Sequence, residues 1–192
     1  MNRREALQRT AAITGIAISS SVGLGLLKGC TPGDKPTWPP VFLKQDEISL
    51  ISAIADIILP KTETVGALDV HVPEFIDLML RDCFSLEEQN AFREGLSAFM
   101  IDVDDEFSNT FEDCTPDEKI KIIEAEEVRS AEQFEKTNNK TFYQTVRELT
   151  LLGFFTSEPV MKNMLDYHPV PGRYDGCIPM TEDTKLYVDN NV

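Results

Sequence analysis

The chain has 192 residues, of which 42% are hydrophobic, so it is long and apolar enough to bury the core of one domain. It carries 33 acidic and 18 basic residues, which give a net charge of −15. This excess argues against nucleic acid or an anionic lipid surface as a partner, because phosphate groups attract lysine and arginine. It favours a solvated acidic surface or a basic protein partner.

Residues 1–29 are predicted to be an export segment and not part of the fold. Arg3 and Arg4 head a positively charged stretch, and a weakly apolar run from Ala11 to Leu27 follows. This order is typical of twin-arginine signals, and the run is less apolar than a spanning helix of about 20 residues would be. The alternative is an uncleaved, membrane-anchored N-terminus. Both alternatives predict a folded domain outside the cytoplasm, in the periplasm or on the outer face of a membrane.

Cys30 closes the sequence Leu27-Lys28-Gly29-Cys30, which resembles a lipoprotein cleavage box. Lys28 departs from the small residue that such a box usually has, so lipidation of Cys30 stays open. If Cys30 is lipidated, the mature chain starts there and is tethered to a membrane leaflet. Residues 30–45 contain several prolines and are predicted to form an extended linker.

Residues 46–192 are predicted to form a single helical domain, from apolar periodicity, capping boxes and proline positions. Asp46 is the expected N-cap of the first helix. The expected helices are 46–59, 73–83, one from Ser85 to about 107, one that begins after Thr115 and ends before Asn138, 141–155, and a short one over 160–165. Strand patterns of useful length are absent from the sequence. The predicted fold is therefore an all-α helical bundle with a long, irregular, Pro/Gly-rich C-terminal segment.

The sequence contains none of the familiar catalytic or metal-binding patterns. Its two histidines, His71 and His168, stand alone on expected loops, and there is no G-x-S-x-G or C-x-x-C frame. The acidic run 102–106 lacks the glycine turn of a calcium loop, which favours a solvated helix end. We therefore predict no catalytic, cofactor-binding or metal-binding residue in this chain.

Besides Cys30, the chain has three cysteines, namely Cys83, Cys114 and Cys177. In an oxidising compartment two of them could pair, and spacing alone does not choose the pair. We favour a disulfide between Cys83 and Cys177, because it would tie the C-terminal segment to the second helix and close a long loop.

The stretch from Tyr167 to Pro179 is unusual, because five prolines and glycines disfavour regular structure there. It also holds two tyrosines and Arg173, which are residue types enriched in protein interfaces. Two interpretations stay open. The stretch is either a partner interface or a loop that wraps back over the bundle.

Several short motifs together resemble the gluconate 2-dehydrogenase subunit 3 family over roughly residues 42–179. They are ADIILP at 55–60, GA at 66–67, VPEFID at 72–77, TSE at 156–158 and PVPGRY at 169–174. His168 departs from the acidic or small residue that the family often has before the last motif.

The resemblance implies a small, non-catalytic subunit of an extracytoplasmic, flavin-dependent sugar or sugar-acid dehydrogenase. The FAD is expected in a large flavoprotein partner, and electrons would pass on to a cytochrome or the membrane. The small subunit would engage the twin-arginine translocase through Arg3 and Arg4 and escort the large one. The expected partner interface comprises Tyr167, Pro169, Pro171, Gly172, Arg173 and Tyr174.

Two other functions remain as alternatives. The first is an autonomous enzyme that uses the acidic clusters with a metal ion, which the missing catalytic frame disfavours. The second is a stand-alone extracytoplasmic lipoprotein that binds a ligand and has no redox partner.

Overall fold

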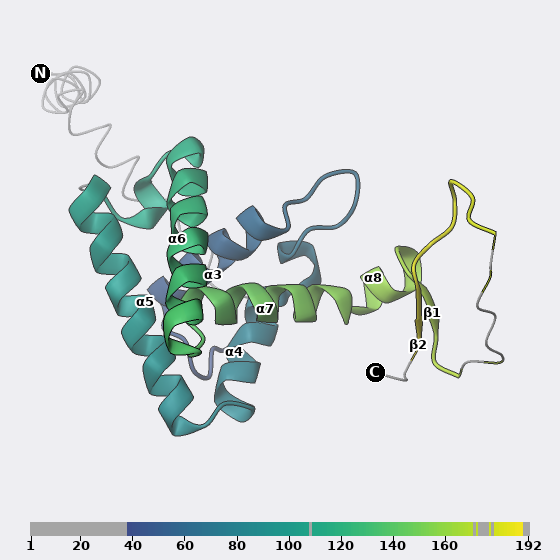
Figure 1. Cartoon of the computed structure of the whole chain (residues 1–192), viewed down its shortest axis with the longest axis horizontal. Coiled ribbons are helices and arrows are strands. Elements are labelled where there is room, and N and C mark those ends of the chain that lie inside the picture. Colours follow the sequence, from purple (N-terminus) through teal and green to yellow (C-terminus); the bar gives the residue numbers. More distant parts are fainter. Residues whose placement is uncertain (1–37, 108, 171, 173–176, 178, 190–192) are drawn as a thin grey trace, which may run out of the picture. The chain divides into compact units, whose positions relative to one another are not determined.

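The structure, a computed structural model, describes residues 38–107, 109–170, 172, 177 and 179–189 (Figure 1). The chain divides into two units, residues 1–37 and 38–192. All of the described residues belong to the second unit. The predictions for Arg3, Arg4 and Cys30 fall outside the described residues.

The described part is built from six α-helices, which confirms the predicted all-α class. Short 3-10 turns, η1 and η2, precede α4 and α6, and two three-residue strands follow α8. The elements are α3 (Gln45–Ile58), η1 (Leu68–Val70), α4 (Val72–Asp82), α5 (Leu86–Phe107), η2 (Phe111–Asp113), α6 (Pro116–Thr137), α7 (Phe142–Phe155), α8 (Glu158–Asn163), β1 (Asp166–His168) and β2 (Tyr187–Asp189).

Local hydrogen bonds set the first residues of the helices. The Ser85 amide donates to Glu88 Oε2 at 2.8 Å, and the Thr115 amide donates to Glu118 Oε2 at 2.8 Å, as the capping boxes predict. The prediction of Asp46 as the cap of the first helix is wrong. Lys44 is the N-cap, because its amide donates to Glu47 Oε2 at 2.8 Å and α3 therefore starts at Gln45.

Helix α7 is central to the fold and packs against α3, α4, α5, α6 and α8 (Figure 1). Val146 and Thr150 on α7 are fully buried. Gly153 allows close approach of α4, because a Cβ atom at this position would lie 2.6 Å from Cδ1 of Phe75. Because α7 contacts five other helices, it is the element on which the remaining helices are assembled.

Three phenylalanines from α5 and α7 form an aromatic cluster at the other side of the core. The ring centroid of Phe142 lies 5.7 Å from that of Phe92 and 5.3 Å from that of Phe99. These separations are typical of favourable tilted and edge-to-face pairs. Aromatic packing therefore fixes α5 against the start of α7.

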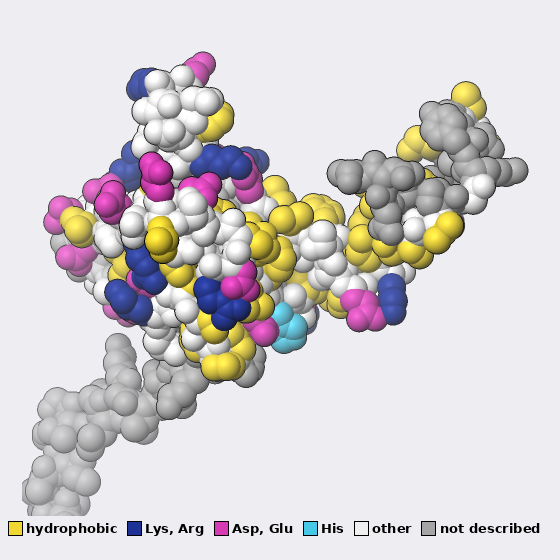
Figure 2. All heavy atoms as spheres, turned by 90° about the horizontal axis from the view of Figure 1, so that it is seen from below, with side chains coloured by type: hydrophobic (Ala, Val, Ile, Leu, Met, Phe, Trp, Pro, Cys, Tyr) yellow, Lys and Arg dark blue, Asp and Glu magenta, His cyan; other side chains and the backbone are white. Residues whose placement is uncertain are grey.

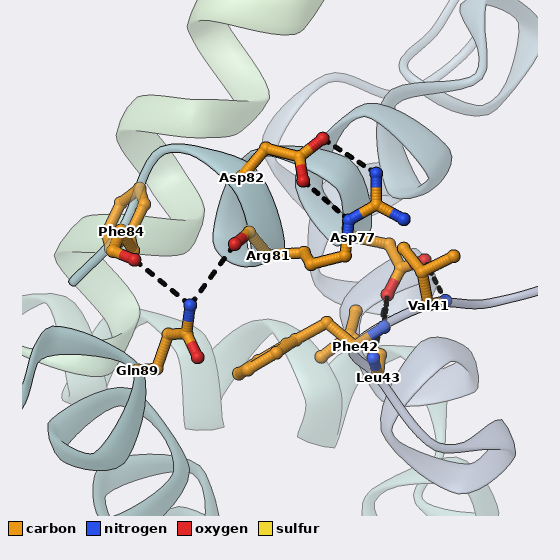
Figure 3. A network of polar contacts seen from close by, with 8 residues as sticks. All are labelled: Val41, Phe42, Leu43, Asp77, Arg81, Asp82, Phe84 and Gln89. Carbon is orange, nitrogen blue, oxygen red and sulfur yellow. Dashed lines mark hydrogen bonds and ion pairs between the residues drawn. The ribbon is translucent and has the colours of Figure 1, made fainter. Parts of the chain in front are cut away.

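The buried carboxylate of Asp77 on α4 holds the residues that precede α3 (Figure 3). It accepts hydrogen bonds from the amides of Val41 at 2.8 Å, Phe42 at 2.9 Å and Leu43 at 2.7 Å. Leu43 is buried, and Trp38 packs in part against the core. The described end of the predicted linker, residues 38–44, is thus bound to the helices, and the domain begins before the predicted boundary at residue 46.

Arg93 on α5 secures the same residues from the other side. Its Nη2 donates to the Phe42 carbonyl at 2.6 Å, and its guanidinium lies 4.1 Å from the centroid of the Phe42 ring. Its Nη1 also lies 3.3 Å from Glu47 Oε2. We call residues 38–44 the clamped segment.

The corner between α4 and α5 is closed by backbone-directed hydrogen bonds (Figure 3). Gln89 Nε2 donates to the carbonyls of Phe84 at 3.0 Å and Arg81 at 3.3 Å. Arg81 pairs with its neighbour Asp82 at 2.6 Å between Nε and Oδ1. The end of α4 and the start of α5 are therefore fixed relative to each other.

The C-terminal segment is more regular than the sequence predicts. Strands β1 and β2 pair in parallel, with Tyr167 opposite Val188. The sequence gives no sign of this pairing, because each strand is short and its partner is about twenty residues away. The prolines and glycines between the strands also favour an irregular structure there. Among the helices of the described part, none is long and apolar enough to cross a membrane.

Candidate partner interface

Of the predicted interface residues, Tyr167 lies in β1, and Pro169 and Gly172 follow it. Tyr167 is half-buried within β1, and Pro169 and Gly172 are exposed. A Cβ atom on Gly172 would meet nothing within 4 Å, so the chain stands clear of its neighbours there. The remaining predicted residues, Pro171, Arg173 and Tyr174, lie outside the described residues.

Exposed hydrophobic side chains surround this stretch. Val170 is 81% exposed and Met180 is 86% exposed. Exposed hydrophobic side chains, with exposed fractions of 42% to 70%, also lie on β2 and the residue before it and on the last turn of α7. We call these residues the C-terminal apolar surface: Leu152, Phe155, Val170, Met180, Leu186 and Tyr187. Figure 2 shows hydrophobic side chains along the part of the chain that α7, α8 and the C-terminal segment form.

The C-terminal apolar surface includes none of the predicted interface residues, and of its members only Val170 falls within the stretch 167–179. The 141–155 helix reads as apolar and central, so nothing in its pattern marks Leu152 and Phe155 as exposed. Phe155 packs edge-on against Phe154, with ring centroids 5.3 Å apart. Met180 and Leu186 lie in a stretch where the sequence gives no helical or strand periodicity.

Several contacts hold the C-terminal segment in place. The Asp166 amide donates to the Leu186 carbonyl at 3.0 Å, and Lys185 Nζ donates to the Asn163 carbonyl at 2.7 Å. Val160 on α8 is fully buried beneath the segment's start. These contacts connect α8 to β1 and β2, so the apolar side chains are presented from a defined backbone.

His168 forms a small polar cluster with one residue of β1 and one residue of β2. Its ring stacks on Tyr187 at a centroid distance of 5.2 Å and an interplanar angle of 25°. Its Nε2 lies 3.1 Å from Asp166 Oδ1. The ring stack joins the end of β1 to the beginning of β2, which gives this histidine a structural role.

The three described cysteines are free thiols, with Cys83 and Cys177 exposed and Cys114 buried. The predicted Cys83–Cys177 disulfide is therefore not formed in this structure. Cys83 follows α4 and Cys177 lies between β1 and β2, so their backbones belong to separately anchored elements. Burial raises the pKa of the Cys114 thiol.

The residues that could titrate in a reaction are dispersed. Among the residues that the structure describes, no group of three or more His, Cys, Asp or Glu side chains could hold a metal ion. His71 is exposed and caps α4 in a left-handed conformation, with φ of 58°. In the run 102–106, only Val103 is buried. Burial raises the pKa of Tyr143 on α7, and a hydrogen bond from Lys162 lowers that of Glu158 on α8.

The fold and these surfaces define a small all-α domain whose C-terminal part presents apolar side chains. The family model described as gluconate 2-dehydrogenase subunit 3 matches residues 45–172, which is two thirds of the chain. The chain therefore belongs to the gluconate 2-dehydrogenase subunit 3 family. No curated protein and no solved structure matches it. Membership implies an accessory subunit within a multisubunit dehydrogenase complex.

Proposed function

We propose that this chain is the non-catalytic small subunit of an extracytoplasmic, flavin-dependent sugar or sugar-acid dehydrogenase. Catalysis and the FAD reside in a large flavoprotein partner, and a cytochrome subunit takes up the electrons. Residues 1–29 carry the complex to the twin-arginine translocase through Arg3 and Arg4. After export the complex stays in the periplasm or on the outer face of the membrane, where Cys30 is the candidate site of lipid anchoring.

The observation that carries the proposal is the C-terminal apolar surface. Its six hydrophobic side chains lie on the last turn of α7, on β2 and in the segments around the strands, and all remain exposed. Exposed apolar side chains of this kind mark interaction sites. The family match extends into this region and ends at residue 172. Association would remove these side chains from water, which stabilises a complex by roughly 25 cal/mol for each Å² of apolar area buried.

The C-terminal segment with β1 and β2 would form the docking surface together with the end of α7. Met180 and Val170 would insert into the flavoprotein, as the most exposed members of the surface. Tyr167, Pro169 and the neighbouring predicted residues 171–174 would form the rim. The bound small subunit would cover an apolar area of the large subunit and carry it through export in the folded state.

The test is co-purification of the full-length chain with a flavoprotein from its own envelope extract. A large partner with flavin absorbance, retained by the wild-type chain and lost with Val170→Asp and Met180→Asp together, is the expected result. Leu86→Asp is the matched control, because Leu86 is 77% exposed but lies on α5, and it should retain the partner. A colourless eluate without a partner would refute the proposal and favour the stand-alone lipoprotein.

A further inference from the structure

A groove runs between α5 and α6, away from the C-terminal apolar surface. It encloses about 390 Å³ and its floor is apolar, formed by the buried Phe99, Val103 and Ile122. Glu106 lines it from α5, and Lys121 lines it from α6. The groove therefore combines an apolar floor with charged sides, which is the layout that receives an amphipathic helix.

One end of the groove is closed by an ion-pair bridge between the helices. Arg129 on α6 pairs with Asp102 on α5 and with Glu126 on its own helix. Glu126 is buried and also accepts a hydrogen bond from Ser130 Oγ at 3.1 Å. Because the bridge occupies the charges of Arg129, Asp102 and Glu126 together, the other charged side chains that line the groove are Glu106 and Lys121. The excess of negative charge comes from the acidic residues elsewhere on the two helices.

The two helices carry much of the negative charge of the chain. Helix α5 has seven acidic residues and one basic residue, and α6 has seven acidic and four basic residues. Ile101 on α5 and Val128 on α6 are also 60% and 61% exposed. The helix pair thus offers apolar and negatively charged surface together.

We infer that the α5–α6 groove docks a cationic amphipathic helix of a second partner protein. The aliphatic side of that helix would contact Phe99, Val103 and Ile122, and its lysines or arginines would face Glu106 and the acidic residues around it. Charge complementarity selects this occupant, because an anionic lipid surface or a second copy of this acidic chain would be repelled. The inference does not depend on the flavoprotein docking at the C-terminal apolar surface.

The experiment uses the ¹⁵N-labelled full-length chain and a synthetic leucine–lysine peptide of roughly 14 residues, about four helical turns. Its leucines lie on one helical face. A control peptide has the same composition in scrambled order. We expect the amphipathic peptide alone to shift the amide signals of α5 and α6, with an affinity that falls as salt is added.

Two variants place the binding in the groove. Glu106→Lys reverses a charge on its side, and Ala125→Trp fills it, since Ala125 is exposed and lines the groove. Each should weaken binding about tenfold or more, because like charges and lost contacts both act at the docking site. Glu182→Lys on the C-terminal segment makes the same change in net charge and should leave the affinity within about twofold.

Three results would each overturn the inference. An equal loss of peptide affinity in Glu106→Lys and Glu182→Lys would mean that the peptide binds through attraction to the net charge of the chain. Equal binding of the scrambled peptide would mean that binding does not depend on an apolar helical face. Shifts of the same amides by phosphatidylglycerol vesicles would identify a lipid surface as the occupant. Co-purification of the flavoprotein, by contrast, should be unaffected in both groove variants.

Discussion

Removal of the Asp77 carboxylate should detach the clamped segment from the helices. The carboxylate accepts three backbone hydrogen bonds of 2.7 to 2.9 Å while fully buried. Hydrogen bonds to a charged acceptor contribute about 1.5 to 3 kcal/mol each, but the three amides can regain water when the segment moves away. The loss of stability therefore cannot exceed the free energy with which the clamped segment docks on the helices. We expect Asp77→Ala to lower the free energy of unfolding by about 3 kcal/mol.

Asp77→Asn should have a smaller effect that the geometry explains. Oδ1 accepts from Phe42 and Leu43, and Oδ2 accepts from Val41. An asparagine can keep the two bonds to its carbonyl oxygen, but its amide nitrogen then faces the Val41 amide as a second donor. The expected cost is about half that of the alanine variant, or ~1.5 kcal/mol.

Trp38 provides a direct reading of the clamped segment, because it is the only tryptophan of the chain and packs against the core. Its emission should shift to the red in Asp77→Ala before the helices unfold, as followed by circular dichroism in a urea titration. Asp82→Asn is the control on the same helix, where an exposed ion pair with Arg81 should leave both signals unchanged. An Asp77→Ala variant with wild-type stability and unchanged Trp38 emission would refute the clamp.

Three further predictions concern the helices. Gly153→Ala should destabilise the domain by about 1 to 2 kcal/mol in chemical denaturation, because the added Cβ would lie 2.6 Å from Phe75; a stability gain would disprove this close contact. Thr150→Val should stabilise it by about 1 kcal/mol, because the Thr150 hydroxyl is buried without a hydrogen-bond partner; a lower melting temperature would contradict this. Hydrogen bonds from the Thr115 backbone and side chain lower the pKa of Glu118, so this carboxylate contributes stability above its ordinary pKa of 4.5 that is lost as pH falls below it. Glu118→Gln should therefore be less stable than the wild type at pH 7, with the difference vanishing in acid, and an equal difference at all pH values would exclude this ionic contribution.

The sequence by itself determined the helices and most of their starts. The Ser85 and Thr115 capping boxes act across three residues, so their hydrogen bonds depend on neighbours that the sequence places there. The fifth helix, predicted to start at Thr141, starts at Phe142 with Thr141 as its N-cap. The same local rule explains the error at Asp46. Glu47 lies three residues after Lys44 and its carboxylate accepts a hydrogen bond from the Lys44 amide, so the capping box starts at Lys44.

Only the tertiary structure decided the long-range features. Asp77 binds residues 34 to 36 positions earlier, and no local pattern marks which buried carboxylate will accept those amides. The β1–β2 pairing and the exposure of Leu152 and Phe155 also depend on what packs nearby. Helix caps are local because their partners lie within one turn, whereas a clamp, a parallel strand pair and an exposed apolar surface exist only once distant segments have come together.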